Sequence, residues 1–237
     1  MGYLIKFISI FVCLALGFYI YKTDSGLFVL VLFFLINIVF ATLSFFIIDT
    51  YKIYIPQAGY VLSLLIYIPV IQTNKKYKER ITWNKSGKID KAVVLLIFVM
   101  TVISAVSLYL WAVFIKKDLS MFRIYIPKAH YLVLIAYALF FPLYNAVIEE
   151  FISRAVLYDG FFNLSGNIPV TIISQAMVFS LWHFFGFPGG VVGVVMVFIW
   201  SLFLGFIRYK SKGMLAPLAA HFFADLSIVI ILYFLIM

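Results

Sequence analysis

Long apolar stretches separated by short polar segments make up almost the whole chain. A helix needs about 20 apolar residues to cross the hydrocarbon core of a bilayer. The stretches that approach or reach this length are residues 3–21, 27–48, 54–72, 92–115, 131–157, 168–187, 190–207 and 215–236. The pattern therefore predicts an all-α fold, a polytopic transmembrane helix bundle of about eight spans.

The polar segments between the predicted spans indicate the topology. Residues 73–91 are rich in Lys and Arg, and the positive-inside rule places them in the cytoplasm. Alternation of the spans then places the basic loop 208–213 on the same side and both termini outside, although Lys116 and Lys117 oppose this scheme. We expect residues 116–130 to lie along the membrane interface and residues 159–167 to form a turn-rich connector.

Composition agrees with a membrane protein and excludes a soluble domain. The chain is 66% hydrophobic and 11% charged, whereas soluble domains are about 45–50% apolar and about 25% charged. The net charge of +9 resides in loops beside the membrane, so we expect contact with anionic lipid and no nucleic-acid binding. The single cysteine, Cys13, cannot form an intrachain disulfide, and the apolar stretch around it has no signal-peptide cleavage site.

Ionisable side chains inside the later predicted spans are the first sign of function. An ionised carboxylate in hydrocarbon costs at least roughly 2.5–3.5 kcal/mol, so such residues usually face one another inside the bundle. Those of the C-terminal half lie on three predicted helices: Glu149, Glu150, Arg154, His183, His221 and Asp225. Carboxylates, imidazoles and a guanidinium together could form a hydrolytic centre, with a carboxylate as general base on water and an imidazole facing the oxyanion.

The spacing of these residues also allows structural roles. Glu150 and Arg154 are four residues apart and can form an ion pair, and His221 can likewise be oriented by Asp225 or make a helix–helix contact. His183, four residues after Phe179, could be a hydrogen-bonded core histidine.

Straight helices would place Glu149 and His183 near opposite membrane faces. If the two residues meet, either the glutamate helix is tilted or broken, or residues 159–168 dip into the membrane.

Three short motifs resemble a known family. EEFISR at 149–154, FSLWH at 179–183 and HFFAD at 221–225 are similar to the motifs EExxxR, FxxxH and HxxxN/D of the CAAX protease and bacteriocin-processing (CPBP, or Abi) family of intramembrane proteases. The resemblance covers roughly residues 130–237. We therefore divide the chain into N-terminal transmembrane helices, 1–120, with the basic loop 73–91, and a CPBP/Abi-like protease core, 121–237.

The resemblance implies a role for each matching residue. Glu149 would activate the attacking water with help from His183, and His221 with Asp225 would stabilise the oxyanion. Glu150 and Arg154 would brace the site, with Phe179 supporting it. Eukaryotic prenyl-protein members carry Asn at the position of Asp225. An ionised Asp cannot donate a hydrogen bond, so here it would orient His221 or be protonated.

The family is also often labelled metalloprotease. Glu149, His183 and His221 could bind Zn²⁺ or another divalent metal with an open position. Since HExxH is absent and the histidines come from different helices, we favour a metal-free mechanism without a cofactor.

The sequence thus predicts an intramembrane endopeptidase in a bacterial cytoplasmic membrane. Its substrate would be a bacteriocin or signalling-peptide precursor, a leader peptide, another membrane protein, or a CAAX-like protein. One alternative is a non-proteolytic regulator or bacteriocin-immunity protein that binds a partner membrane protein. Another is a transporter with a carboxylate proton relay, which the lack of inverted-repeat symmetry disfavours.

Overall fold

Every element in the described part of the chain is a helix. The computed structural model describes residues 15, 58–115, 119 and 130–236. The elements after residue 57 are α3 (Ala58–Thr73), α4 (Lys75–Lys78), α5 (Lys91–Leu110), η1 (Trp111–Ile115), α6 (Tyr131–Glu150), η3 (Phe151–Leu157), α7 (Tyr158–Ser165), α8 (Ile168–Trp182), η4 (His183–Phe185), α9 (Gly190–Ser211) and α10 (Leu215–Ile236). The prediction of an all-α fold is confirmed for these residues.

Four of the described helical stretches are long and apolar enough to cross a membrane. They are Lys91–Ile115, Tyr131–Ser165, Gly190–Ser211 and Leu215–Ile236, each containing one of the predicted spans or most of it. The apolar helix α8 is shorter, with 15 residues. Apart from residue 15, the first two predicted spans lie outside the described residues, as does nearly all of the predicted interfacial segment 116–130.

The described residues group into two compact units. One contains residues 58–81 and 159–166, where the Asn163 side-chain amide donates to the Arg80 carbonyl oxygen at 3.2 Å. The other contains residues 82–158 and 167–236 and includes all the candidate site residues. Helix α5, which the sequence division assigned to the N-terminal part, packs in this second unit.

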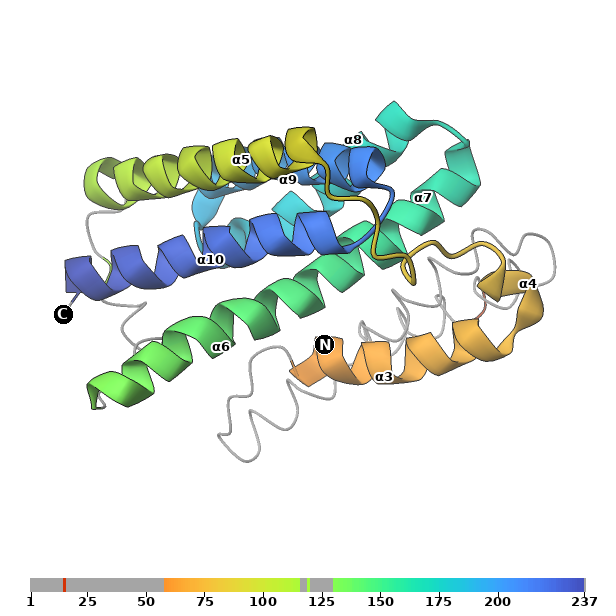
Figure 1. The fold of residues 1–237 in the computed structure, drawn as a ribbon, viewed down its shortest axis with the longest axis horizontal. Helices are drawn as coiled ribbons and strands as arrows, with labels where there is room; N and C mark the ends of the chain where they lie inside the picture. The colour runs from red at the N-terminus through yellow and green to blue at the C-terminus, as the bar shows by residue number, and fades with distance from the viewer. Residues whose placement is uncertain (1–14, 16–57, 116–118, 120–129, 237) are drawn as a thin grey trace. The chain divides into compact units, whose positions relative to one another are not determined.

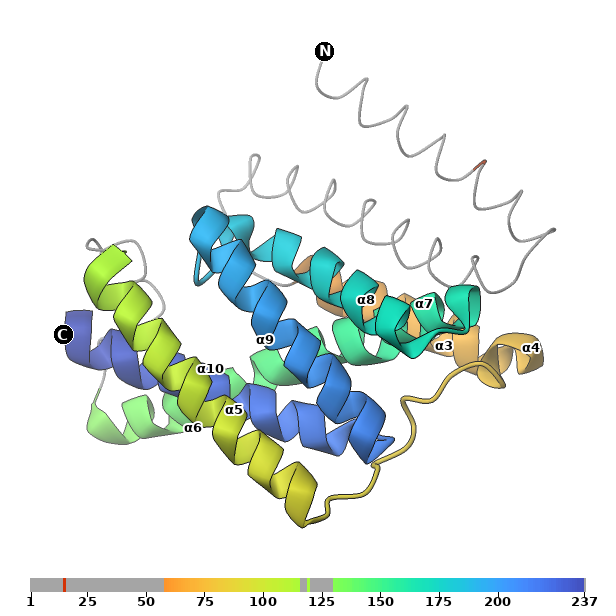
Figure 2. The same ribbon diagram turned by 90° about the horizontal axis from the view of Figure 1, so that it is seen from above.

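In the second unit, α10 lies against both α5 and α6, and α9 lies against α8 (Figure 1). The view from above shows α5 and α9 running in a similar direction, and both cross α10 (Figure 2). Small residues of α10 allow this close approach. One buried cluster joins three helices and contains Val93, Met100, Leu204, Ile207, Ala216 and Ala220.

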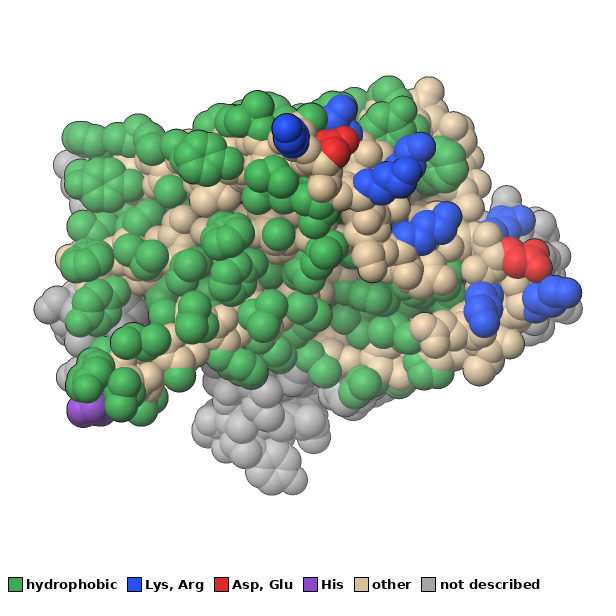
Figure 3. Space-filling view, in the orientation of Figure 1, with side chains coloured by type: hydrophobic (Ala, Val, Ile, Leu, Met, Phe, Trp, Pro, Cys, Tyr) green, Lys and Arg blue, Asp and Glu red, His purple; other side chains and the backbone are tan. Residues whose placement is uncertain are grey.

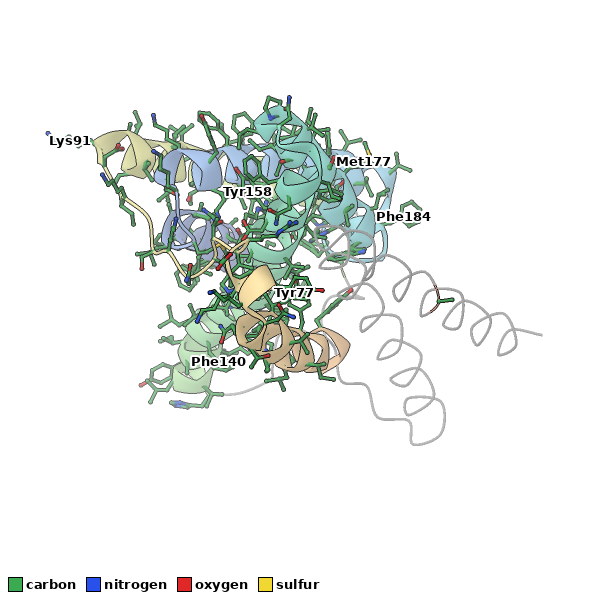
Figure 4. The ribbon with its side chains drawn as sticks, turned by 90° about the vertical axis from the view of Figure 1, so that its right-hand side faces the viewer. Tyr77, Lys91, Phe140, Tyr158, Met177 and Phe184 are labelled. Atoms are coloured by element: carbon green, nitrogen blue, oxygen red, sulfur yellow. The ribbon has the colours of Figure 1, made fainter. Side chains whose placement is uncertain are left out.

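The outside of this unit is apolar along the helices and basic at one end. Hydrophobic side chains cover α5, α6 and α10, and Lys and Arg gather near the loop that precedes α5 (Figure 3). Phe140 projects outward from α6, and Lys91 projects away from the start of α5 (Figure 4). A lipid-facing belt with a charged end is the expected surface of a membrane protein.

The loop before α5 is joined to the turn between α9 and α10 by backbone hydrogen bonds. The Lys88 N–H donates to the Ser211 carbonyl oxygen at 2.8 Å, and the Met214 N–H donates to the Lys85 carbonyl oxygen at 2.9 Å. The two basic loops therefore lie on the same side, as predicted. The boundary of the second was wrong, because α9 continues to Ser211 and ends at Lys212, which has a left-handed φ of 56°.

The helix that carries the glutamates is longer than predicted. The helical stretch Tyr131–Ser165 has 35 residues and passes through the π-helical η3, so the predicted connector at 159–167 was wrong. A single glycine in a helix costs only about 1 kcal/mol, and Gly160 is accommodated inside α7. The helix ends instead at Gly166, with φ +61°, after which the Asn167 side chain caps α8.

Candidate active site

The in-membrane ionisable residues of the C-terminal half meet in one place. Glu149 and Glu150 close α6, and Arg154 lies on η3. His183 opens the short turn η4 after α8, and α10 supplies His221 and Asp225 one helical turn apart. The extra residue per turn in η3 occurs immediately after the glutamates, and π-helical segments of this kind are frequent at functional sites.

His221 is surrounded by three carboxylates. Its Nδ1–H donates to Oε1 of Glu150 at 2.7 Å. Its Nε2 lies 3.6 Å from Oε2 of Glu149 and 3.5 Å from Oδ1 of Asp225. Trp200 and Phe179 meet the imidazole edge-on, with ring centroids 4.7 Å and 6.3 Å away. The buried ring therefore has a fixed orientation, with one nitrogen on Glu150 and the other facing the remaining two carboxylates.

Glu149 and His183 form the open edge of the cluster. Their side chains are 24% and 17% exposed, whereas those of Glu150 and His221 are 1% and 3% exposed. Oε2 of Glu149 lies 3.8 Å from Nε2 of His183. The Nδ1–H of His183 donates to the Phe179 carbonyl oxygen at 3.0 Å, so a neutral imidazole presents Nε2 as an acceptor toward Glu149.

Arg154 occupies the buried side of the cluster. Its guanidinium forms the expected ion pair with Oε1 of Glu150 at 2.9 Å and donates to the Ser201 hydroxyl at 2.9 Å. It also lies over the rings of Phe179 and Trp200, 5.0 Å and 5.6 Å from their centroids. A planar guanidinium suits such combined ion pairing and stacking. The spacing of Glu149, Glu150 and Arg154 thus places one glutamate at the open edge and the other against a buried cation.

Residues 131–227 match the family model described as type II CAAX prenyl endopeptidase Rce1-like. This part of the chain is similar to that family. No curated protein and no solved structure matches the chain. The resemblance inferred from the three motifs is confirmed, and the match to the Rce1-like family supports a protease in a membrane.

The Rce1-like region contains all the predicted site residues, from Glu149 to Asp225. Their individual roles remain predictions. Among the described residues, no three His, Cys, Asp or Glu side chains form a group arranged to hold a metal ion. The triad of Glu149, His183 and His221 is not among such groups, and we derive no step through a metal.

Several residues of the site were missed by sequence reasoning. Ser201 and Gln175 lie beside Arg154, and the Gln175 amide donates to the Ser201 carbonyl oxygen at 3.1 Å. Arg208 was assigned to a loop, but it is buried and its Nε–H donates to the Arg154 carbonyl oxygen at 3.1 Å. Asn145 donates from Nδ2 to Oδ2 of Asp225 at 2.9 Å. Asn145 had a usable signal in the sequence, because it precedes Glu149 by one helical turn.

Proposed function

We propose that this protein is an intramembrane endopeptidase that hydrolyses a peptide bond with water activated by Glu149. The observation that carries the proposal is the position of the Glu149 carboxylate. It is partly exposed at the edge of an otherwise buried cluster, and its Oε2 lies between Nε2 of His183 and Nε2 of His221. A general base must lie within reach of the water that it deprotonates. It must also lie near the groups that stabilise the negative charge developing on the carbonyl oxygen, here the two imidazoles.

In the proposed reaction, Glu149 takes a proton from water, and the water oxygen attacks the carbonyl carbon of the scissile bond. The carbonyl electron pair moves to oxygen, and the resulting oxyanion is stabilised by His221, which Asp225 and Glu150 orient. His183 helps to hold the water through Nε2. When the C–N bond breaks, the proton held by Glu149 passes to the amine leaving group.

Glu150 and Arg154 have a supporting part in this scheme. Oε1 of Glu150 accepts the His221 Nδ1–H and also contacts the Arg154 guanidinium. The His221 imidazole is thus held at Nδ1 by Glu150, while its Nε2 faces Glu149. This division gives the adjacent glutamates different chemistry, with one serving as base and the other as anchor.

The substrate class follows from the family and from the apolar surroundings. The Rce1-like family description names CAAX prenyl endopeptidases, so a membrane-associated protein or peptide precursor is the proposed substrate. For a bacterial source, a leader peptide, bacteriocin precursor or signalling peptide fits best. The proposed location is the bacterial cytoplasmic membrane.

The test is cleavage by purified protein in detergent of a panel of membrane-associated peptide precursors. Glu149→Gln should lower kcat by about 100-fold to 10,000-fold, because the general base is lost. The matched control is Glu79→Gln, which makes the same exchange at an exposed glutamate of the basic loop and should leave kcat unchanged. Cleavage by Glu149→Gln at the wild-type rate would overturn the assignment of the base.

The same assay with a chelator tests the metal-free scheme. Activity that survives the chelator supports a base acting directly on water. Activity that is lost and then restored by Zn²⁺ would replace the proposed mechanism with a metal-dependent one. If the wild type cleaves no peptide and Glu149→Gln keeps its cellular phenotype, the non-proteolytic alternative would replace the protease.

A further inference from the structure

An asparagine on the glutamate helix holds the carboxylate of Asp225. Nδ2 of Asn145 donates to Oδ2 of Asp225 at 2.9 Å, and this bond joins α6 to α10 across 80 positions of the chain. Asn145 lies one helical turn before Glu149, and its side chain is also close enough to the Glu149 carboxylate to interact with it. None of the three family motifs includes this residue.

The two oxygens of Asp225 have different partners. Oδ2 accepts from Asn145, while Oδ1 lies 3.5 Å from Nε2 of His221. The side chain of Asp225 is 8% exposed, so solvent contributes little to holding it. A carboxylate fixed at one oxygen by a neighbouring donor has its other oxygen fixed as well, since the group is planar and rigid.

The charges around the site explain why the donor is an amide. Glu149, Glu150 and Asp225 bring three carboxyl groups to His221, and the guanidinium of Arg154 contacts only Glu150 among them. A lysine or arginine at position 145 would compete with His221 for Asp225, whereas another carboxylate would repel it. An amide satisfies a buried carboxylate oxygen without adding charge.

We propose that Asn145 is a positioning residue of this active site, and that its amide sets Asp225 so that the carboxylate orients His221. The inference rests on the proposed function. In this chain the carboxylate lies on α10 and its amide partner lies on α6, so the pair spans two helices.

The exchange of the two side chains gives a direct test. Asn145→Asp places two carboxylates against each other and should lower kcat roughly 10-fold to 100-fold with little change in KM, because it disturbs orientation rather than substrate binding. The double variant Asn145→Asp/Asp225→Asn rebuilds an amide–carboxylate pair in reverse and should recover most of the lost kcat. Wild-type kcat in Asn145→Asp, or no recovery in the double variant, would overturn the proposal.

Two further variants separate positioning from a loss of folding. Asn145→Ala removes the donor without adding charge and should lower kcat while the protein remains folded in detergent. The matched control is Asn167→Asp, because Asn167 caps α8 at an exposed position where Asp caps equally well. A fall in kcat for Asn167→Asp equal to that for Asn145→Asp would overturn the proposal.

The inference can also be tested without any cleavage, so that its failure is distinct from failure of the proposed function. The chain has three histidines, and ¹⁵N labelling makes their ring nitrogens visible in detergent. The His221 signals should shift in Asn145→Asp, return toward wild type in the double variant and stay unchanged in Asn167→Asp. Unshifted His221 signals in Asn145→Asp would overturn the proposal whatever the protein cleaves.

Discussion

At the scale of single residues, the two adjacent glutamates show how one helical step separates two chemical roles. Glu149 is 24% exposed beside His183, whereas Glu150 is 1% exposed against Arg154 and His221. Successive helix positions point about 100° apart, so neighbouring carboxylates reach different surroundings. The same sequence pair thus provides one partly exposed carboxylate and one buried carboxylate.

The Glu150–Arg154 pair has a testable effect on stability. Arg154→Met should lower the free energy of unfolding by about 3–5 kcal/mol, because it leaves the buried Glu150 carboxylate without its cation. In the double variant Glu150→Gln/Arg154→Met the charge is also removed, so the loss should be smaller. Unfolding in detergent, followed by circular dichroism, measures both. A double variant less stable than Arg154→Met would contradict a charge-pairing role.

At the scale of elements, the loop before α5 and the turn after α9 are joined through two glycines. A Cβ on Gly87 would lie 2.7 Å from the Cα of Gly213, and Gly87 also has φ +87°. Glycine is therefore required there by both space and backbone conformation. This contact places the basic loop directly at the starts of α5 and α10.

Substitution at these glycines separates crowding from backbone strain. Gly87→Ala should be more destabilising than Gly166→Ala, because Gly166 also has a positive φ of +61° but nothing within 4 Å of a Cβ. The left-handed conformation alone costs about 1–2 kcal/mol for an alanine, so the excess in Gly87→Ala measures crowding. Thermal unfolding of the two variants in detergent gives the comparison. Equal losses of stability in the two variants would show that the turn adjusts to the added Cβ of Gly87→Ala and that crowding adds no destabilisation there.

At the scale of the whole molecule, the topology is the property that can be checked directly. The hydrogen bonds between residues 85–88 and 211–215 place the two basic loops on one side. The start of α6 lies at the end of the second unit where α10 finishes (Figure 1). The positive-inside rule predicts that the side with the basic loops is cytoplasmic.

Single cysteines introduced into a Cys13→Ser background test this arrangement. Ser86→Cys and Lys210→Cys should both react with a membrane-impermeant maleimide only when the cytoplasmic face is accessible, because both positions are exposed beside the joined loops. His130→Cys, exposed just before α6, should react from the other face. Labelling of Ser86→Cys and Lys210→Cys from opposite faces would contradict the topology.

Several features of the protein could be predicted from the sequence because they are local. Apolar length predicts spans, and four of these correspond to long apolar helices in the described part of the chain. The spacing of four residues predicts the Glu150–Arg154 pair, since helix geometry alone brings such positions together. Ionisable side chains within apolar spans predicted the candidate site without knowledge of the packing, because such charges are costly in hydrocarbon.

The tertiary structure decided the contacts between helices far apart in the chain. The Asn145–Asp225 bond and the Arg208 contact to the Arg154 carbonyl oxygen join different helices, and no spacing rule reaches across 80 or 54 positions. Likewise, the glutamate helix continues through η3 to Ser165, although the residues at 159–167 are of types that favour turns. The sequence alone predicted which residues form the candidate site, because burying charge in a membrane is costly. Helix packing decided which of them touch, because it depends on surfaces brought together only in the folded bundle.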